Sequence, residues 1–155
     1  MLTLQAATQV ASPPTIVWDV LVDWPGQSRW IPFTTVDVVS DHDQGLGVQA
    51  AALSGCRLGR IPFGLLDNFV VTGWMAPSDG IAAELEVLHL GPYFTGEGVF
   101  SLKRADGGTA VRCTEVFRVP GGAAVEVMIR AALPIMRRAL EHSLRRLAAV
   151  VDGRT

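Results

Sequence analysis

Two titratable residues, His89 and Glu115, stand at positions that the strand pattern places inside the fold. In residues 109–119 alternate positions are apolar except for Glu115, and the positions between them are mostly polar. Residues 81–90 alternate in the same way and put His89 on the buried face. Because successive strand side chains point to opposite faces, both groups should face the interior. An inward imidazole and carboxylate can anchor a ligand's hydroxyl or carbonyl group, or act as general acid and base.

The strand predicted at 95–104 lies between those of His89 and Glu115 in an antiparallel meander. Its inward positions near them are Gly96 and Gly98, which offer no side chain to separate the pair. The short hairpins predict Gly96 opposite His89 and Gly98 opposite Glu115. The two side chains can then lean toward each other, directly or through one water, and Glu115 should raise the pKa of His89. The alternative is that the glycines only bend the sheet.

Glu115 also has a purely structural interpretation. An inward carboxylate is costly unless it is paired, hydrated or protonated. It could lie at a hydrated end of a cavity, hydrogen-bonded to an arginine such as Arg130 or to the backbone. Ion pairs of this kind perturb titration without serving a function. The sequence leaves both interpretations open.

Turn signals and periodicity predict the elements that must position these groups. Residues 2–10 are predicted as a strand, 15–22 as a helix and 27–31 as a second short helix. Six further strands are predicted over 34–40, 47–54, 67–75, 81–90, 95–104 and 109–119, separated by turns. Strands in series without intervening helices indicate an antiparallel meander in an α+β fold. Residues 123–151 are predicted as an amphipathic helix on the curved sheet, kinked or broken at Pro134.

An apolar segment without strand periodicity, Ile61–Leu66, follows the second of these six strands. We expect a loop there, which either covers the mouth of a cavity as a lid or packs against the core. Tyr93 and Phe94, in a later turn, could close the same mouth.

Four segments carry a resemblance to a known family. They are VWDVLVDWPGQSRWIPF, LLDNFVVTGWMAP, HLGPYFTGEGVF and GGTAVRCTEVFRVPGG. With the order strand, two short helices, six strands and long helix, the chain resembles the START-like helix-grip (SRPBCC) superfamily. Within it, the chain looks like the polyketide cyclase/dehydrase and lipid-transport group. Spanning nearly the whole chain, the resemblance implies a seven-stranded curved antiparallel sheet that grips the last helix around an elongated apolar cavity.

The strand faces and the resemblance together indicate which side chains line this cavity. Trp30 and Phe33 should border it, because the short second helix commonly does so in the resembled fold. Phe63 and Tyr93 are expected at its mouth. The remaining wall residues are expected to be Leu85, Val87, Phe100, Val111, Phe117, Met128, Leu133 and Met136.

Three functions agree with this pattern. The first is binding or carriage of a small hydrophobic ligand that is lipid-like, polyketide-like or aromatic. The alternative is a polyketide cyclase or dehydratase that uses His89 and Glu115 as acid and base. The third is a protein-interaction or toxin–antitoxin role, which a cavity filled by side chains such as Phe100 would favour. Binding is preferred, because a cyclase usually needs several polar groups along its pocket and the pattern supplies two.

Composition excludes several other classes of protein. The chain has 155 residues, 49% hydrophobic and 18% charged, which excludes disorder and predicts a single domain over 1–155. A net charge of −2 gives no field that favours nucleic acid. Cys56 and Cys113 form neither a disulfide framework nor a zinc motif, and no metal or cofactor is expected. With no signal peptide or membrane-span run recognised, we expect a cytoplasmic protein, with a homodimer left open.

Overall fold

The computed structural model describes residues 1–58, 61–78 and 81–153, with the side chains of 56–58 and 61–63 outside the description. The elements are β1 (Leu2–Val10), α1 (Pro14–Leu21), η1 (Pro25–Arg29), β2 (Thr34–Val38), β3 (Gln49–Leu58), β4 (Ile61–Met75), β5 (Ala83–Pro92), β6 (Thr95–Ala105), β7 (Gly108–Arg118) and α2 (Gly122–Val151). This order confirms the predicted succession of one strand, two short helices, six strands and a long helix.

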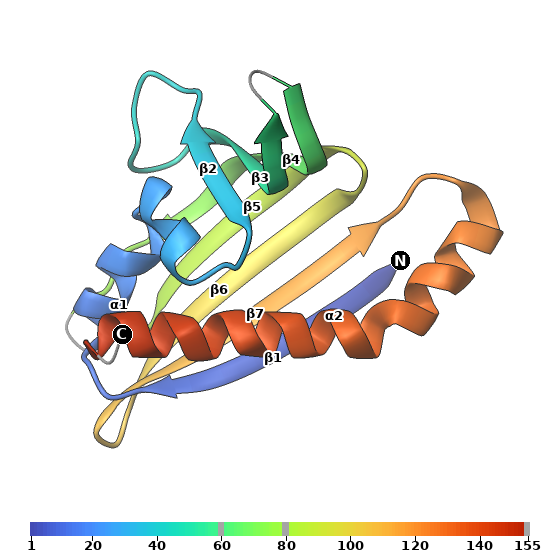
Figure 1. The fold of residues 1–155 in the computed structure, drawn as a ribbon. Coiled ribbons are helices and arrows are strands. Elements are labelled where there is room, and N and C mark those ends of the chain that lie inside the picture. The colour runs from blue at the N-terminus through green and yellow to red at the C-terminus, as the bar shows by residue number, and fades with distance from the viewer. Residues whose placement is uncertain (59–60, 79–80, 154–155) are drawn as a thin grey trace.

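All seven strands belong to one antiparallel sheet, in the order β1-β7-β6-β5-β4-β3-β2. Strands β2 to β7 form the predicted meander, and β1 closes the far edge beside β7. The sheet curves, and α2 lies across its face next to β1 and β7 (Figure 1). The short helices α1 and η1 lie near the C-terminal end of α2 (Figure 1). The predicted α+β architecture, a curved sheet around a long helix, is confirmed.

The loop predicted around Ile61–Leu66 is wrong. Residues 61–66 begin β4 and pair with the end of β3, with Gly64 opposite Gly55 and Leu65 opposite Ser54. A ladder of backbone hydrogen bonds needs no alternation of side chains, so periodicity gave no sign of this extension. A Cβ on Gly64 would clash with the Ser54 carbonyl, so glycine allows the two strands to approach closely here.

Helix α2 runs unbroken past Pro134, and its axis changes direction before its midpoint (Figure 1). The prediction of a kink or a break at Pro134 therefore resolves to a bend, as expected where a proline ring removes a helical hydrogen bond. After Pro134, the apolar stripe turns toward the sheet. Leu144 and Leu147 are fully buried there, whereas Ile135 is 72% exposed.

The main core lies between the sheet, the short helices and the C-terminal half of α2. Trp18 packs edge-on against Trp74, with ring centroids 5.1 Å apart, and Trp24 packs against Phe69. Trp24 and Trp30 are both almost completely buried. The tryptophans thus fix the short helices to the sheet.

Replacing a buried residue of α2 should cost far more stability than replacing an exposed one. We expect Leu144→Ala to lower the free energy of unfolding by about 2–5 kcal/mol, because it leaves a cavity in the core. Ile135→Ala should change it by no more than about 0.5 kcal/mol. Urea unfolding followed by circular dichroism measures both. Equal losses for the two variants would contradict the packing of α2 described here.

Candidate ligand-binding site

Three side chains from three strands meet on the buried face of the sheet. The Nδ1 of His89 on β5 lies 2.8 Å from the Oδ2 of Asp67 on β4. Its Nε2 lies 3.1 Å from the Oε2 of Glu115 on β7. The His89 side chain is 10% exposed, and those of Asp67 and Glu115 are 13% and 20% exposed. Asp67, His89 and Glu115, here called the polar triad, form a chain of hydrogen bonds in a largely buried position.

The glycines of β6 make the contact between His89 and Glu115 feasible. Gly96 pairs with His89 and Gly98 pairs with both Val87 and Glu115, so the predicted register is confirmed. A Cβ on Gly98 would lie 2.8 Å from both carboxylate oxygens of Glu115. The carboxylate thus occupies the space that a side chain on Gly98 would fill. The alternative partner Arg130 instead donates to Glu126, at 2.8 Å.

The polar triad holds a proton. Burial alone lowers the pKa of His89, but hydrogen bonds to Asp67 and Glu115 and their charges outweigh it and raise the pKa to about 9. At neutral pH both ring nitrogens therefore carry hydrogen, and each donates to a carboxylate. The buried thiol of Cys113 completes the network by donating to the Oε1 of Glu115 at 3.6 Å, and burial raises its pKa.

The polar triad lines a pocket of about 170 Å³ between the sheet, η1 and α2. Its remaining wall is mostly carbon. The lining residues are Trp24, Gln27, Trp30, Ile31, Thr34, Ala52, Asp67, Phe69, Leu85, Val87, His89, Phe100, Glu115, Leu140 and Ser143. The result is a mostly apolar chamber with a few polar groups in its wall, the arrangement that orients a small ligand.

Two buried polar atoms of the pocket residues have no hydrogen-bond partner among the described residues. They are the indole Nε1 of Trp30 and the Oδ1 of Asp67. The neighbouring Trp24 differs, because its Nε1 donates to the Asp43 carbonyl at 2.8 Å. Buried polar groups normally find partners, so one donor and one acceptor of the pocket residues are left unsatisfied within the described part of the chain.

Aromatic rings flank the polar triad on both sides. Phe69 and Phe94 lie with ring centroids 6.3 and 5.0 Å from that of His89. Phe94 continues the series to Phe117, 6.0 Å away. Trp30 packs edge-on against Phe100 at 6.3 Å. Phe69 and Phe94 thus pack against the imidazole and keep the polar triad in an environment of low polarity.

The structure gathers some of the predicted cavity residues and separates others. Trp30, Leu85, Val87 and Phe100 line the pocket beside the polar triad. Four others pack in the hydrophobic core away from it, namely Val111, Phe117, Leu133 and Met136. Three are on the surface: Phe33 is 86%, Met128 66% and Tyr93 50% exposed. The side chains of Phe63 and Cys56 lie outside the described residues.

The surface positions have local causes. Phe33 has a left-handed backbone (φ 58°), and its carbonyl accepts the N–H of Gly55 at 2.8 Å, which fixes the chain where the ring faces solvent. Met128 lies in the N-terminal part of α2, before Pro134, where its side chain is exposed. Helical periodicity marks an apolar face but not whether a sheet reaches it.

Sequence reasoning missed Asp67, the second carboxylate of the polar triad. A signal was present, because Asp67, Phe69 and Val71 share one face of β4 and the latter two are buried. Two irregularities in the pairing of β4 with β5 obscured it, since they shift the register between Asn68 and Phe69 and again after Val71. Pocket residues from η1 and α2, such as Gln27 and Ser143, had no sequence signal.

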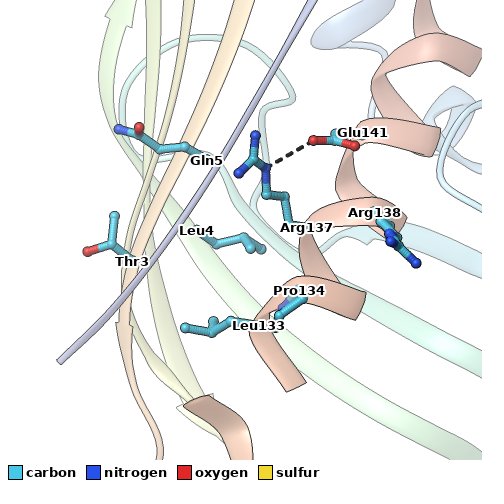
Figure 2. A pocket seen from close by; sticks show the side chains of 8 residues that line it. All are labelled: Thr3, Leu4, Gln5, Leu133, Pro134, Arg137, Arg138 and Glu141. Carbon is cyan, nitrogen blue, oxygen red and sulfur yellow. Dashed lines mark hydrogen bonds and ion pairs between the residues drawn. The ribbon is translucent and has the colours of Figure 1, made fainter. Parts of the chain in front are cut away.

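A wider hollow of about 600 Å³ lies outside, between β1 and α2 (Figure 2). Leu4 and Leu133 form part of its wall. Figure 2 shows Arg137 turned toward Glu141, to which it donates at 3.0 Å, while Arg138 points away from β1. This hollow is open and contains no member of the polar triad, so the smaller internal pocket is the candidate site.

A curved antiparallel sheet that grips a long C-terminal helix over an internal pocket defines the helix-grip class. The model of the polyketide cyclase / dehydrase and lipid transport family matches residues 1–152. The chain belongs to this family, and its membership implies a fold that binds small hydrophobic ligands. No curated protein matches the chain.

Solved structures show the same fold at low identity. The protein TTHA0849 from Thermus thermophilus is 15% identical, with a TM-score of 0.74 and 99% of each chain covered. The hypothetical protein jhp0584 from Helicobacter pylori is 11% identical, with a TM-score of 0.74 over 97% of this chain and 88% of that one. Ara h 8.0201 is 13% identical, with a TM-score of 0.63 and 97% of each chain covered.

Within the described residues, no helix is long and apolar enough to cross a membrane.

Gly98→Ala should weaken the contact between His89 and Glu115 without altering either residue. The added methyl group displaces the Glu115 carboxylate, so the pKa of His89 should fall from about 9 by about one pH unit or more toward its ordinary value. A nuclear magnetic resonance titration of the ring protons measures this pKa. Gly73→Ala, where the new Cβ meets the Glu86 side chain instead, is the matched control and should leave it unchanged. An unchanged pKa in Gly98→Ala would refute the contact.

The polar triad should make stability depend on pH. The pKa of His89 is raised from 6.5 to about 9 on folding, so the folded state keeps its proton longer than the unfolded state does. This stabilisation, about 3 kcal/mol, is complete below pH about 6.5 and disappears as the pH rises to about 9.

Urea unfolding between pH 6 and 10 should therefore show a decline in stability for the natural protein that is absent or shallower in His89→Gln. The difference between the two curves isolates His89 from His42 and Cys113, which change stability in the same direction. Parallel curves would show that His89 does not hold its proton as described.

Proposed function

We propose that the protein binds a small hydrophobic ligand about the size of one ring in the pocket between the sheet, η1 and α2. The observation that carries the proposal is a mostly apolar chamber of about 170 Å³ with a largely buried polar triad in its wall. An apolar cavity of about 150 Å³ is known to hold benzene. The volume supports an aromatic ligand over a long lipid chain or a multi-ring polyketide.

A second candidate is the polyketide cyclase or dehydratase type of enzyme, with the polar triad as acid and base. The raised pKa of His89, about 9, supports it, because a proton is stored beside the pocket. Both ring nitrogens, however, are directed at carboxylates. Proton exchange with a ligand would then pass through Glu115 or the unpartnered Oδ1 of Asp67 rather than directly from His89. Turnover of the bound compound, as opposed to binding alone, separates this candidate from the first.

A protein-interaction or toxin–antitoxin role has less support. It was favoured by a cavity filled by Phe100, Phe117 and Met136, whereas Phe100 lines an open pocket and the other two pack outside it. The proposal gives the protein no nucleic-acid partner, because its net charge is −2. A cytoplasmic location remains the expectation.

Filling the pocket should abolish binding without unfolding the protein. Ala52 lines the pocket opposite Asp67, and a leucine there would occupy much of the space. We expect Ala52→Leu to weaken the binding of benzyl alcohol about tenfold or more in isothermal titration calorimetry. Ala51→Leu adds the same side chain on the other face of β3 and is the matched control.

Native mass spectrometry of the purified protein complements this test by detecting a bound compound of one-ring mass. Equal binding by the natural protein and Ala52→Leu would remove the pocket from the proposal. Absence of binding by the natural protein to every one-ring compound tried would overturn it.

A further inference from the structure

The charges around the pocket are unbalanced. Its titratable lining residues are Asp67 from β4, His89 from β5 and Glu115 from β7, and the lining includes no lysine or arginine among the described residues. With His89 protonated, two carboxylates face one imidazolium, which leaves the pocket with a net charge of −1. A buried uncompensated charge is unfavourable, so a ligand that brings positive charge stabilises the pocket beside these carboxylates.

The unpartnered oxygen of Asp67 shows where such a ligand would bind. Glu115 has both oxygens engaged, one by His89 and the other by the Cys113 thiol. Asp67 uses only Oδ2 for His89, and its buried Oδ1 has no donor within the part of the chain that the structure describes. A buried acceptor without a donor is costly, and a donor on the ligand removes this cost.

The same pocket offers little to a negatively charged ligand. Trp30 is 1% exposed, and its unpartnered N–H is a neutral donor. It can donate to a hydroxyl or a carbonyl oxygen on the ligand, but it supplies no positive charge for an anion. The rings of Trp24, Phe69 and Phe100 add aromatic surface to the wall. Aromatic faces attract cations and tolerate neutral rings.

We propose that the ligand is a one-ring compound whose polar end donates hydrogen bonds to Asp67, with a protonated amine preferred over a hydroxyl and a carboxylate rejected. This inference rests on the proposed function and deepens it by fixing the charge class of the ligand. A carboxylate would meet two like charges, Asp67 and Glu115, with one imidazolium already shared between them. A hydroxyl satisfies Oδ1 but leaves the net charge unchanged.

Three compounds with the same ring and a one-carbon head test the charge class. They are benzylamine, benzyl alcohol and benzoate, each titrated into the natural protein at pH 7.5 in one buffer by isothermal titration calorimetry. Benzylamine should bind about tenfold more tightly than benzyl alcohol, the size of one charge-assisted hydrogen bond. Benzoate should bind more weakly than either.

Asp67→Asn removes the charge and keeps the shape of the side chain. It should abolish the preference for benzylamine over benzyl alcohol while retaining benzyl alcohol binding. Asp106→Asn, in the exposed turn between β6 and β7, changes the net charge by the same amount and should keep the preference. Glu115→Gln also removes a negative charge from the polar triad. It should reduce the preference and serves as the test if Asp67→Asn does not fold.

The outcomes separate this inference from the proposed function. If benzyl alcohol binds but benzylamine is no tighter, or benzoate binds equally well, the charge class is wrong and the binding function stands. A preference unchanged in Asp67→Asn, or in Glu115→Gln where Asp67→Asn does not fold, would also overturn the charge class. If none of the three compounds binds, the proposed function itself fails.

Discussion

The shared proton of His89 is the interaction on which the rest of the pocket depends. Its ring donates to carboxylates on both sides, and each carboxylate comes from a different strand. Without the imidazolium, two acids would stand buried and close together, which the low polarity of the surroundings strongly opposes. The hydrogen-bonded polar triad therefore links side chains of β4, β5 and β7, strands that the backbone ladders of the sheet hold in place. It also supplies the charged groups of a mostly apolar chamber.

The surrounding fold makes room for the polar triad and covers it with apolar side chains. The glycines of β6 leave room for the Glu115 carboxylate where a side chain would have stood. Phe69 and Phe94 pack against the imidazole, while Trp30, which follows η1, completes the wall with Leu140 and Ser143 of α2. A packed core usually closes such spaces. Here a pocket of about 170 Å³ remains between the sheet, η1 and α2.

Much of this arrangement could be predicted from the sequence, and the parts that could not be predicted have physical explanations. Strand alternation and short hairpins fix which residues face inward and which pair, so the contact of His89 with Glu115 followed from the pattern. Asp67 escaped because irregular pairing between β4 and β5 breaks that logic. Phe33 and Met128 escaped because their positions depend on a turn and on a helix bend, which carry no periodic signal.

One measurement tests the central claim most directly, namely the protonation of the His89 ring in the folded protein at pH 7.5. Nitrogen-15 imidazole spectra distinguish a ring with hydrogen on both nitrogens from a ring with hydrogen on one. With a pKa of about 9, His89 should show both nitrogens protonated, each hydrogen-bonded to a carboxylate. A spectrum with one bare nitrogen at this pH would contradict the polar triad and the net charge assigned to the pocket.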